Sequence, residues 1–221
     1  MILFKDLDWY QQCIYKMKYF SKEIETLKQK KSFDLFDQIR VNTLLSIIKS
    51  PMEYATLALT KSVSNKNYAY VPFRKTYFED EKFRKVIKEK IGYVNDEIFF
   101  IYNKLFVDEL YKQFNDMQND EKHSNINTHI VYVTENTGYM EFPGNIIIKD
   151  SVIKRIKGSE QKGVTWNEEN VDLSKNEGYT YEEELYFEYN NREVFSFLDE
   201  VYHMVNNFVL DIKEYIGNNA K

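Results

Sequence analysis

The residues best suited to chemistry lie together in one short polar segment, Asp120-Glu121-Lys122-His123. The segment combines carboxylates, a cation and an imidazole, whose ordinary pKa near 6.5 allows proton transfer at neutral pH. His123, with Lys122 and Asp120 beside it, is therefore the candidate catalytic group. The alternative is a plain helix end, where Lys122 and His123 would face the negative end of the helix dipole.

The other histidines and the cysteine give no metal or cofactor signal. His129 follows His123 by six residues, whereas metal-binding pairs on a helix are usually about three or four apart. His203 lies beside the apolar stripe of a predicted helix, which indicates a packed or surface residue. Cys13 is the single cysteine, so it forms no internal disulfide, and a zinc site would need several Cys or His ligands. We predict no metal site and no cofactor.

The chain contains a basic cluster that is a possible binding surface, and an acidic run whose geometry is poor for a shared cation. A basic cluster between residues 74 and 90 could hold phosphate groups, or could simply be the solvated face of a helix. Its members are Arg74, Lys75, Lys82, Arg84, Lys85, Lys88 and Lys90. In the acidic run Glu182-Glu183-Glu184, the outer two share one face of a predicted strand. Glu183 falls on the apolar side, where we expect it to pair with a basic residue.

No motif in the sequence names a reaction. A phosphate-binding glycine loop, a nucleophile elbow, a Cys-x-x-Cys pair and a His-Glu-x-x-His motif are all missing. No stretch approaches the roughly 20 apolar residues of a membrane span. The first residues show no basic segment followed by an apolar run, which predicts no signal peptide. With a single cysteine, these features indicate a soluble protein of the reducing cytoplasm.

Composition favours a helical protein with a sizeable core. The 221 residues suit one large domain, or one domain that carries an insertion. Aromatic residues make up 16% of the chain, and large rings bury much apolar area. The 18 Tyr and 16 Phe are interpreted mostly as core residues, not as platforms for base stacking. Only seven Gly and three Pro are present, which favours long helices.

Apolar spacing predicts helices over about residues 6–129. A first helix covers about 6–30, and Ser32 caps a second that ends near residue 50. A third helix begins at a capping box in Ser50-Pro51-Met52-Glu53. Residues 64–78 look irregular. Two further helices follow, about 79–91 ended by Gly92, and 95–118 capped by Asn95.

A β-rich insertion is predicted at about residues 130–190, before a closing helix at about 192–216. Short β-branched runs at 130–133, 145–148 and 152–156 predict strands, and residues 158–178 a mobile loop. Alternating aromatic residues between 179 and 189 predict another strand. The closing helix has one broad apolar face, so we expect it to pack on the early helices. The predicted fold is a mainly α single domain, residues 1–221: a helical bundle with a small antiparallel β insertion.

Charge is spread unevenly along the chain. Net charge is −5, but residues 1–158 carry 25 Lys and Arg against 21 Asp and Glu, whereas residues 159–221 carry five against 14. This asymmetry predicts contact between the two portions, within one chain or between two copies. Two differently charged solvated surfaces are the alternative interpretation.

The long helix that ends in Met117-Gln118-Asn119-Asp120-Glu121-Lys122-His123-Ser124 resembles the late part of bacterial HEPN-like helical proteins. The resemblance covers the helical order of about residues 33–129 and the closing helix, but not the β-rich stretch. It implies a dimeric helical bundle of a toxin–antitoxin or phage-defence system. Active members of that family are metal-independent ribonucleases with an Arg, four to six intervening residues, and a His.

The sequence departs from that ribonuclease pattern at the arginine. With His123 as the matching histidine, the three possible positions hold Gln118, Met117 and Asp116. With His129 they hold Ser124, His123 and Lys122, of which Lys122 is a cation. The resemblance therefore also fits an inactive or differently employed relative.

Two functions follow as hypotheses. The first is a non-catalytic interaction protein that forms a homo-oligomer, with another protein as a possible partner. The second is a HEPN-like ribonuclease in which His123 transfers the proton and Lys122, or a residue of the basic cluster, holds the phosphate. RNA is a partner only under the second. The acidic net charge favours the first, because RNA binding depends on neutralising phosphates.

Overall fold

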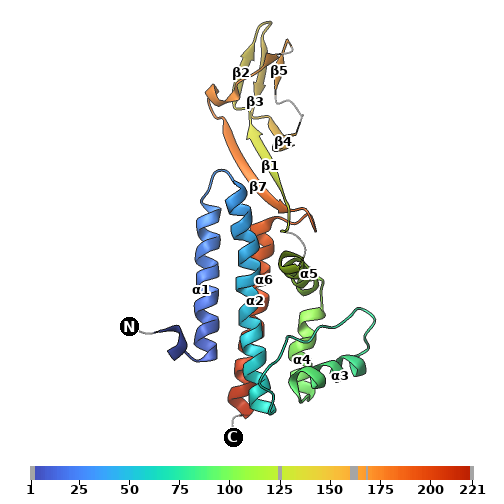
Figure 1. Ribbon diagram of the computed structural model, residues 1–221. Helices are drawn as coiled ribbons and strands as arrows, with labels where there is room; N and C mark the ends of the chain where they lie inside the picture. The colour runs from blue at the N-terminus through green and yellow to red at the C-terminus, as the bar shows by residue number, and fades with distance from the viewer. Residues whose placement is uncertain (1–2, 124–125, 160–163, 168, 220–221) are drawn as a thin grey trace.

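Three long helices form the main body of the molecule: α1 (Trp9–Lys28), α2 (Leu35–Val63) and α6 (Val194–Asn219). The computed structural model describes residues 3–123, 126–159, 164–167 and 169–219, and it places these helices side by side (Figure 1). A short 3-10 turn, η1 (Phe4–Asp6), precedes α1. The closing helix contacts both α1 and α2, which confirms the prediction that it packs back on the early helices.

Helix α1 follows the predicted pattern closely. Its buried side chains are Cys13, Met17, Phe20, Ile24 and Leu27, spaced by three or four residues. At its start, the Asp8 carboxylate accepts from the Gln11 amide at 2.7 Å, and the Gln11 side chain accepts from the Asp8 amide at 3.1 Å. This reciprocal pair satisfies two amides that the helix leaves without partners.

Helix α2 is continuous through Pro51, so the predicted boundary at Ser50-Pro51 is wrong. Proline lacks the N–H that would bond to the Ile47 carbonyl. The Ser50 hydroxyl donates to that carbonyl instead, at 2.7 Å. The helix also starts later than predicted, because Asp34 and not Ser32 caps it, accepting from the Asp37 amide at 3.0 Å.

Three shorter helices pack beside this body: α3 (Asp80–Ile91), α4 (Asp96–Asn103) and α5 (Leu110–His123). Gly92 ends α3 with φ 92°, and a Cβ there would lie 2.6 Å from the Ser64 Cβ, so the position needs glycine. Asn95 caps α4 as predicted, accepting from the Ile98 amide at 2.9 Å.

The single helix predicted over 95–118 is wrong, because the chain breaks between α4 and α5. A 3-10 turn, η2 (Lys104–Phe106), follows α4. The Asp108 carboxylate then accepts from the Leu110 amide at 2.9 Å and starts α5 afresh. At the break, the Phe106 ring packs edge-on against Phe73, Phe83 and Tyr111, with centroids 5.2–5.4 Å apart. Tertiary packing of this ring therefore overrides the helical spacing.

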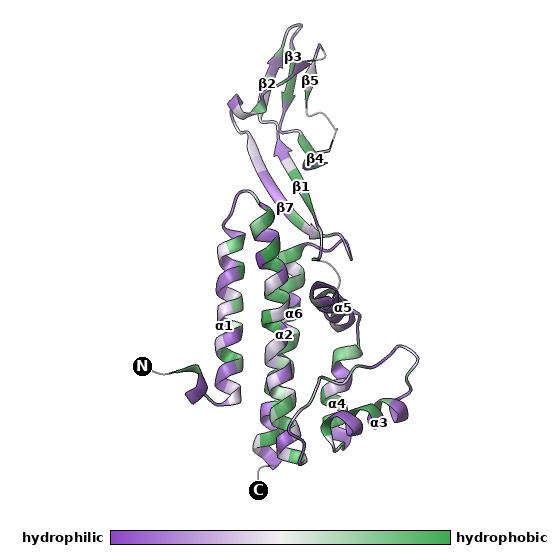
Figure 2. Cartoon of the chain, in the orientation of Figure 1, coloured by the Kyte–Doolittle hydropathy of each residue, from purple (hydrophilic) through white to green (hydrophobic). Residues whose placement is uncertain are grey.

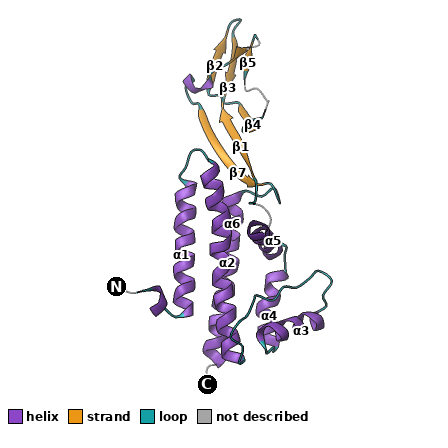
Figure 3. Ribbon diagram, viewed as in Figure 1, coloured by secondary structure: helices purple, strands orange, loops and turns teal. Residues whose placement is uncertain are grey.

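Residues 129–187 form a β-arm that projects from one end of the helices (Figures 1 and 3). Its main sheet is antiparallel, in the order β4 (Val152–Ile156), β1 (His129–Asn136), β7 (Thr180–Phe187). Two strand pairs complete the arm: β2 (Tyr139–Phe142) with β3 (Ile146–Lys149), and β5 (Thr165–Trp166) with β6 (Glu169–Asn170). The predicted antiparallel β insertion is confirmed. The segment predicted as a loop, 158–178, also contains β5, β6 and the 3-10 turn η3 (Leu173–Lys175).

One apolar cluster includes residues of all six α-helices and reaches the arm at Leu185 and Phe187. Hydrophobic and hydrophilic residues alternate along the helices, as the green and purple stretches of Figure 2 show. Val133, Met140 and Leu173 are buried farther out in the arm and lie outside that cluster. Whether the chain behaves as the predicted single domain stays a prediction. In the described residues, no helix is long and apolar enough to cross a membrane.

Candidate functional site

The predicted catalytic segment lies at the end of α5. His123 is the last residue of the helix and is exposed, as is Asp120. In the described part of the chain, no hydrogen bond or ion pair involves His123. The side chain of Lys122 lies outside the described residues. The catalytic assignment of His123, Lys122 and Asp120 therefore stays a prediction, and the helix-end interpretation matches where the helix stops.

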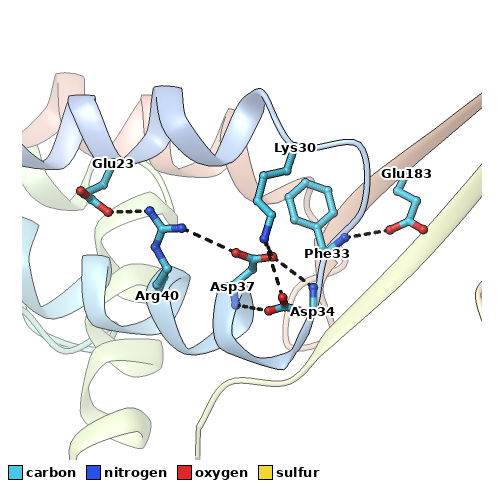
Figure 4. A network of polar contacts seen from close by, with 7 residues as sticks. All are labelled: Glu23, Lys30, Phe33, Asp34, Asp37, Arg40 and Glu183. Atoms are coloured by element: carbon cyan, nitrogen blue, oxygen red, sulfur yellow. Dashed lines mark hydrogen bonds and ion pairs between the residues drawn. The ribbon is translucent and has the colours of Figure 1, made fainter.

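A network of charged side chains joins the end of α1 to the start of α2 (Figure 4). At its centre, the Asp37 carboxylate is buried and forms ion pairs with Lys30 and, at 3.7 Å, with Arg40. Arg40 also binds Glu23 at 2.8 Å. A buried carboxylate needs such partners, because desolvation of an unpaired charge is costly. The network therefore fixes the turn on which the β-arm rests.

Glu183 connects that turn to the arm. Its side chain is 1% exposed, accepts from the Phe33 amide at 3.0 Å and pairs with Lys157 at 2.8 Å. Burial by itself would raise the pKa of Glu183, but the hydrogen bonds from Lys157, Tyr181 and the Phe33 amide outweigh it, so the pKa is lowered. The prediction that Glu183 pairs with a basic residue is confirmed. These contacts tie β7 to the turn before α2 and to the residue after β4.

Beside this anchor lies a hollow of about 480 Å³ between the start of α2 and the sheet. Its lining is largely apolar and includes Phe33, Leu35, Ile130, Val131 and Ile156. His129 also lines it, with both ring nitrogens buried and without hydrogen-bond partners in the described structure. Burial lowers the pKa of His129 to about 4, so its ring is neutral at pH 7. On the adjoining turn of α2, Leu35 and Phe36 are each 76% exposed.

The segment that contains α3 carries exposed tyrosines and lysines, and the Lys82 ammonium lies 5.1 Å from the Tyr77 ring centroid. We call this set the tyrosine–lysine surface and define it by Tyr68, Tyr70, Tyr77, Tyr93, Lys82, Lys85, Lys88 and Lys90. The four tyrosines are 45–70% exposed, so they are exceptions to the interpretation of the aromatic residues as mostly core. They fall in the irregular stretch 64–78 and just past Gly92, outside any helical stripe, and that position is the signal that could have identified them.

The basic cluster predicted from the sequence divides into two groups. The arginines are structural, since Arg74 pairs with Asp80 and Arg84 with Asp96, each at 2.8 Å. The Lys82 ammonium lies 4.4 Å from the Phe78 ring centroid. Within the described residues, Lys85, Lys88 and Lys90 are exposed and form no ion pair. Only the lysines are thus available to a charged partner.

Lys49 is a buried cation that sequence reasoning missed. It is 5% exposed and donates to the Tyr111 hydroxyl and to Asn115 Oδ1, each at 2.9 Å. Burial raises the pKa of Tyr111, so this hydroxyl stays neutral and accepts from the ammonium. Lys49 thereby links α2 to α5 through the core. Lys49 follows Ile48 within an apolar stripe of the sequence, and that position could have indicated that Lys49 is buried.

In the described part of the chain, no three His, Cys, Asp or Glu side chains gather as metal ligands would. Comparisons with protein-family models, with curated proteins and with solved structures find no match. Interpretation of the surfaces therefore rests on their geometry and charge.

Proposed function

We propose that this protein acts in the cytoplasm by binding another protein chain through its β-arm, and that it catalyses no reaction. The observation that carries the proposal is the exposed apolar surface of the arm. Ile146 and Ile147 on β3 are 46% and 53% exposed, and Val152 and Ile156 on β4 are 66% and 43% exposed. Val152 and Ile156 lie on the same face of β4, since they are four residues apart along the strand. Exposed apolar side chains that share a face are typical of interaction sites.

The position of β4 strengthens the proposal. In the sheet order β4-β1-β7, β4 is an outer strand, and the described residues supply no strand on its free side. An uncovered strand with apolar side chains invites pairing with another chain, so proteins normally shield it. A bound partner would supply that shield. The anchor at Glu183 holds the arm in place for this purpose.

The test is position-specific crosslinking in the native cell. A photoreactive amino acid at Ile147 or Ile156 is expected to give a discrete protein adduct, whereas one at Lys22, exposed on α1, is expected to give none. Adding Val152→Glu should abolish the arm adducts, because a charge would then occupy the apolar contact. Equal labelling at all three positions, or no adduct at the arm, would reject the proposal.

A second candidate function is RNA cleavage of the HEPN-like, metal-independent type, in a toxin–antitoxin or phage-defence system. The tyrosine–lysine surface favours it, since exposed aromatic rings beside lysines can stack bases and neutralise phosphates. The test is RNA cleavage by the purified protein in EDTA, beside His123→Ala. Cleavage that the variant loses would establish this function and overturn the non-catalytic proposal; no cleavage by either protein would reject it.

A further inference from the structure

The β-arm has an excess of negative charge that its own basic residues do not neutralise. Residues 129–187 include 11 Asp and Glu against six Lys and Arg. Four of those basic residues already pair within the arm, in Lys154–Glu184, Arg155–Glu135, Lys157–Glu183 and Lys175–Asp172. Exposed carboxylates without an ion pair in the described residues remain at Glu141, Asp150, Glu169, Glu177 and Glu182. The arm therefore presents an acidic, partly apolar surface.

The segment that contains α3 has the opposite excess. Residues 64–93 include eight Lys and Arg against four Asp and Glu. After the arginine pairs are formed, Lys85, Lys88 and Lys90 face solvent, and the Lys82 ammonium lies 5.1 Å from the ring centroid of the exposed Tyr77. Val107, in the neighbouring turn, is 80% exposed. The tyrosine–lysine surface is thus basic and partly apolar, and it complements the arm in charge and in character.

The fold keeps these two surfaces apart. The arm projects from one end of the long helices, and α3 lies near the other end (Figure 1). None of the extensive contacts between the described elements joins α3 to a strand of the arm. The contact predicted between residues 1–158 and 159–221 is present within the chain, in the ion pairs Lys28–Asp199, Lys104–Asp211, Lys154–Glu184 and Lys157–Glu183. The complementarity of the arm and the tyrosine–lysine surface is separate from it, and a second copy of the chain can satisfy it.

We infer that the partner of the β-arm is a second copy of this chain, and that the arm of each copy docks on the tyrosine–lysine surface of the other. The inference rests on the proposed function of the arm. Two antiparallel copies related by a two-fold axis would form both contacts at once and close the assembly. Opposite charges steer the two surfaces together, and the apolar side chains of β3 and β4 cover exposed tyrosine rings.

The experiment measures self-association of the purified full chain by sedimentation velocity at low and high salt. Two reversed variants are compared with the wild type: Lys85→Glu with Lys88→Glu on α3, and Glu177→Lys with Glu182→Lys on the arm. Each is expected to weaken dimerisation about tenfold, because several attractive pairs become repulsive. High salt should weaken the wild-type dimer, since these charges are exposed.

Rescue separates this inference from simple misfolding. A chain with all four substitutions should dimerise again, and a mixture of the two reversed variants should form a heterodimer. The inference would be overturned if the wild type is monomeric under all conditions. It would also be overturned if the charge-reversed variants lose dimerisation and the chain with all four substitutions does not regain it. Binding of a short oligouridine gives a further test. If all the proteins are monomeric, and the oligouridine binds the wild type and the arm variant but not the α3 variant, the inference is overturned and the surface is assigned to RNA.

The crosslinks at Ile147 and Ile156 distinguish this failure from failure of the proposed function. An adduct with twice the mass of the chain supports both. An adduct with a different protein supports arm-mediated binding and rejects the second copy as partner. No adduct rejects both together.

Discussion

His129 differs from the other two histidines because its ring nitrogens are buried, whereas His123 and His203 are exposed. Its ring packs against Phe187, with centroids 5.0 Å apart, where the arm meets the helices. Above pH 6.5 the residue is neutral in both folded and unfolded chains, so it does not make stability depend on pH. Below that pH the His129 ring gains a proton in the unfolded chain. In the folded chain the ring stays neutral until the pH falls to about 4, because burial lowers its pKa.

The first prediction follows from that difference in proton uptake. Between pH 7 and pH 5, His129 should lower the free energy of unfolding by up to about 2 kcal/mol. His129→Phe should remove this part of the acid sensitivity, because phenylalanine has no proton to gain. Urea unfolding at the two pH values measures it, and the matched control, His203→Gln, should behave like the wild type. An unchanged pH dependence in His129→Phe would contradict the assigned burial.

Single residues were predictable where a local pattern determined their surroundings. Alternation along the strand placed Glu183 on the apolar side, and the structure gives it a basic partner. Lys49 could not be predicted in the same way, since its burial depends on Tyr111 and Asn115 arriving from α5. The exposed tyrosines of the tyrosine–lysine surface were missed for the converse reason: aromatic rings suggest burial, and only the fold shows which ones lack a covering element.

At the scale of elements, Pro51 tests how a helix tolerates proline. Ser50→Ala should cost about 1 kcal/mol, because it leaves the Ile47 carbonyl without a donor. In a Pro51→Ala background the same change should cost nearly nothing, since the new backbone N–H can bond to that carbonyl. Urea unfolding of the four proteins gives the coupling between the two sites. Equal costs of Ser50→Ala in both backgrounds would show that the hydroxyl does not compensate for the proline.

Anchoring of the arm depends on one side of β7. Glu183→Gln should destabilise the base of the arm by about 1–3 kcal/mol, because the charge-assisted contact to Lys157 is lost. Hydrogen exchange of the β4 and β7 amides reports this local change. Glu182→Gln is the matched control, because Glu182 is exposed on the opposite face of the strand. If both variants exchange alike, the anchor lies elsewhere.

Elements were predictable from the sequence where their ends are determined locally. Asn95 and Gly92 act through neighbouring backbone groups, and both were assigned correctly. The end predicted at Pro51 and the continuous helix predicted over 95–118 were wrong for a common reason. A serine hydroxyl in one case, and the packing of Phe106 among distant rings in the other, outweighed the local signal. Short strands such as β5 and β6 gave too little pattern to be predicted.

At the scale of the whole molecule, the distribution of buried residues predicts a gradient of stability along the long axis. Buried side chains fill the helical end, whereas the arm beyond Leu185 contributes Val133, Met140 and Leu173. Amides of β2 and β3 should therefore exchange at least about tenfold faster than those of α2 and α6 in native-state hydrogen exchange. Uniform protection throughout would instead show that the chain unfolds as the single domain predicted from its sequence.

Cys13 makes the contact between α1 and α2 observable without any added label. Its thiol is fully buried, donates to the Pro51 carbonyl at 3.4 Å, and has its pKa raised to about 12 by burial. A thiol reagent needs access to the sulfur and a thiolate to react with. In the closed bundle the sulfur is buried and the thiol stays protonated. Because the chain has no other cysteine, the rate at which Cys13 is alkylated measures how often the two N-terminal helices separate.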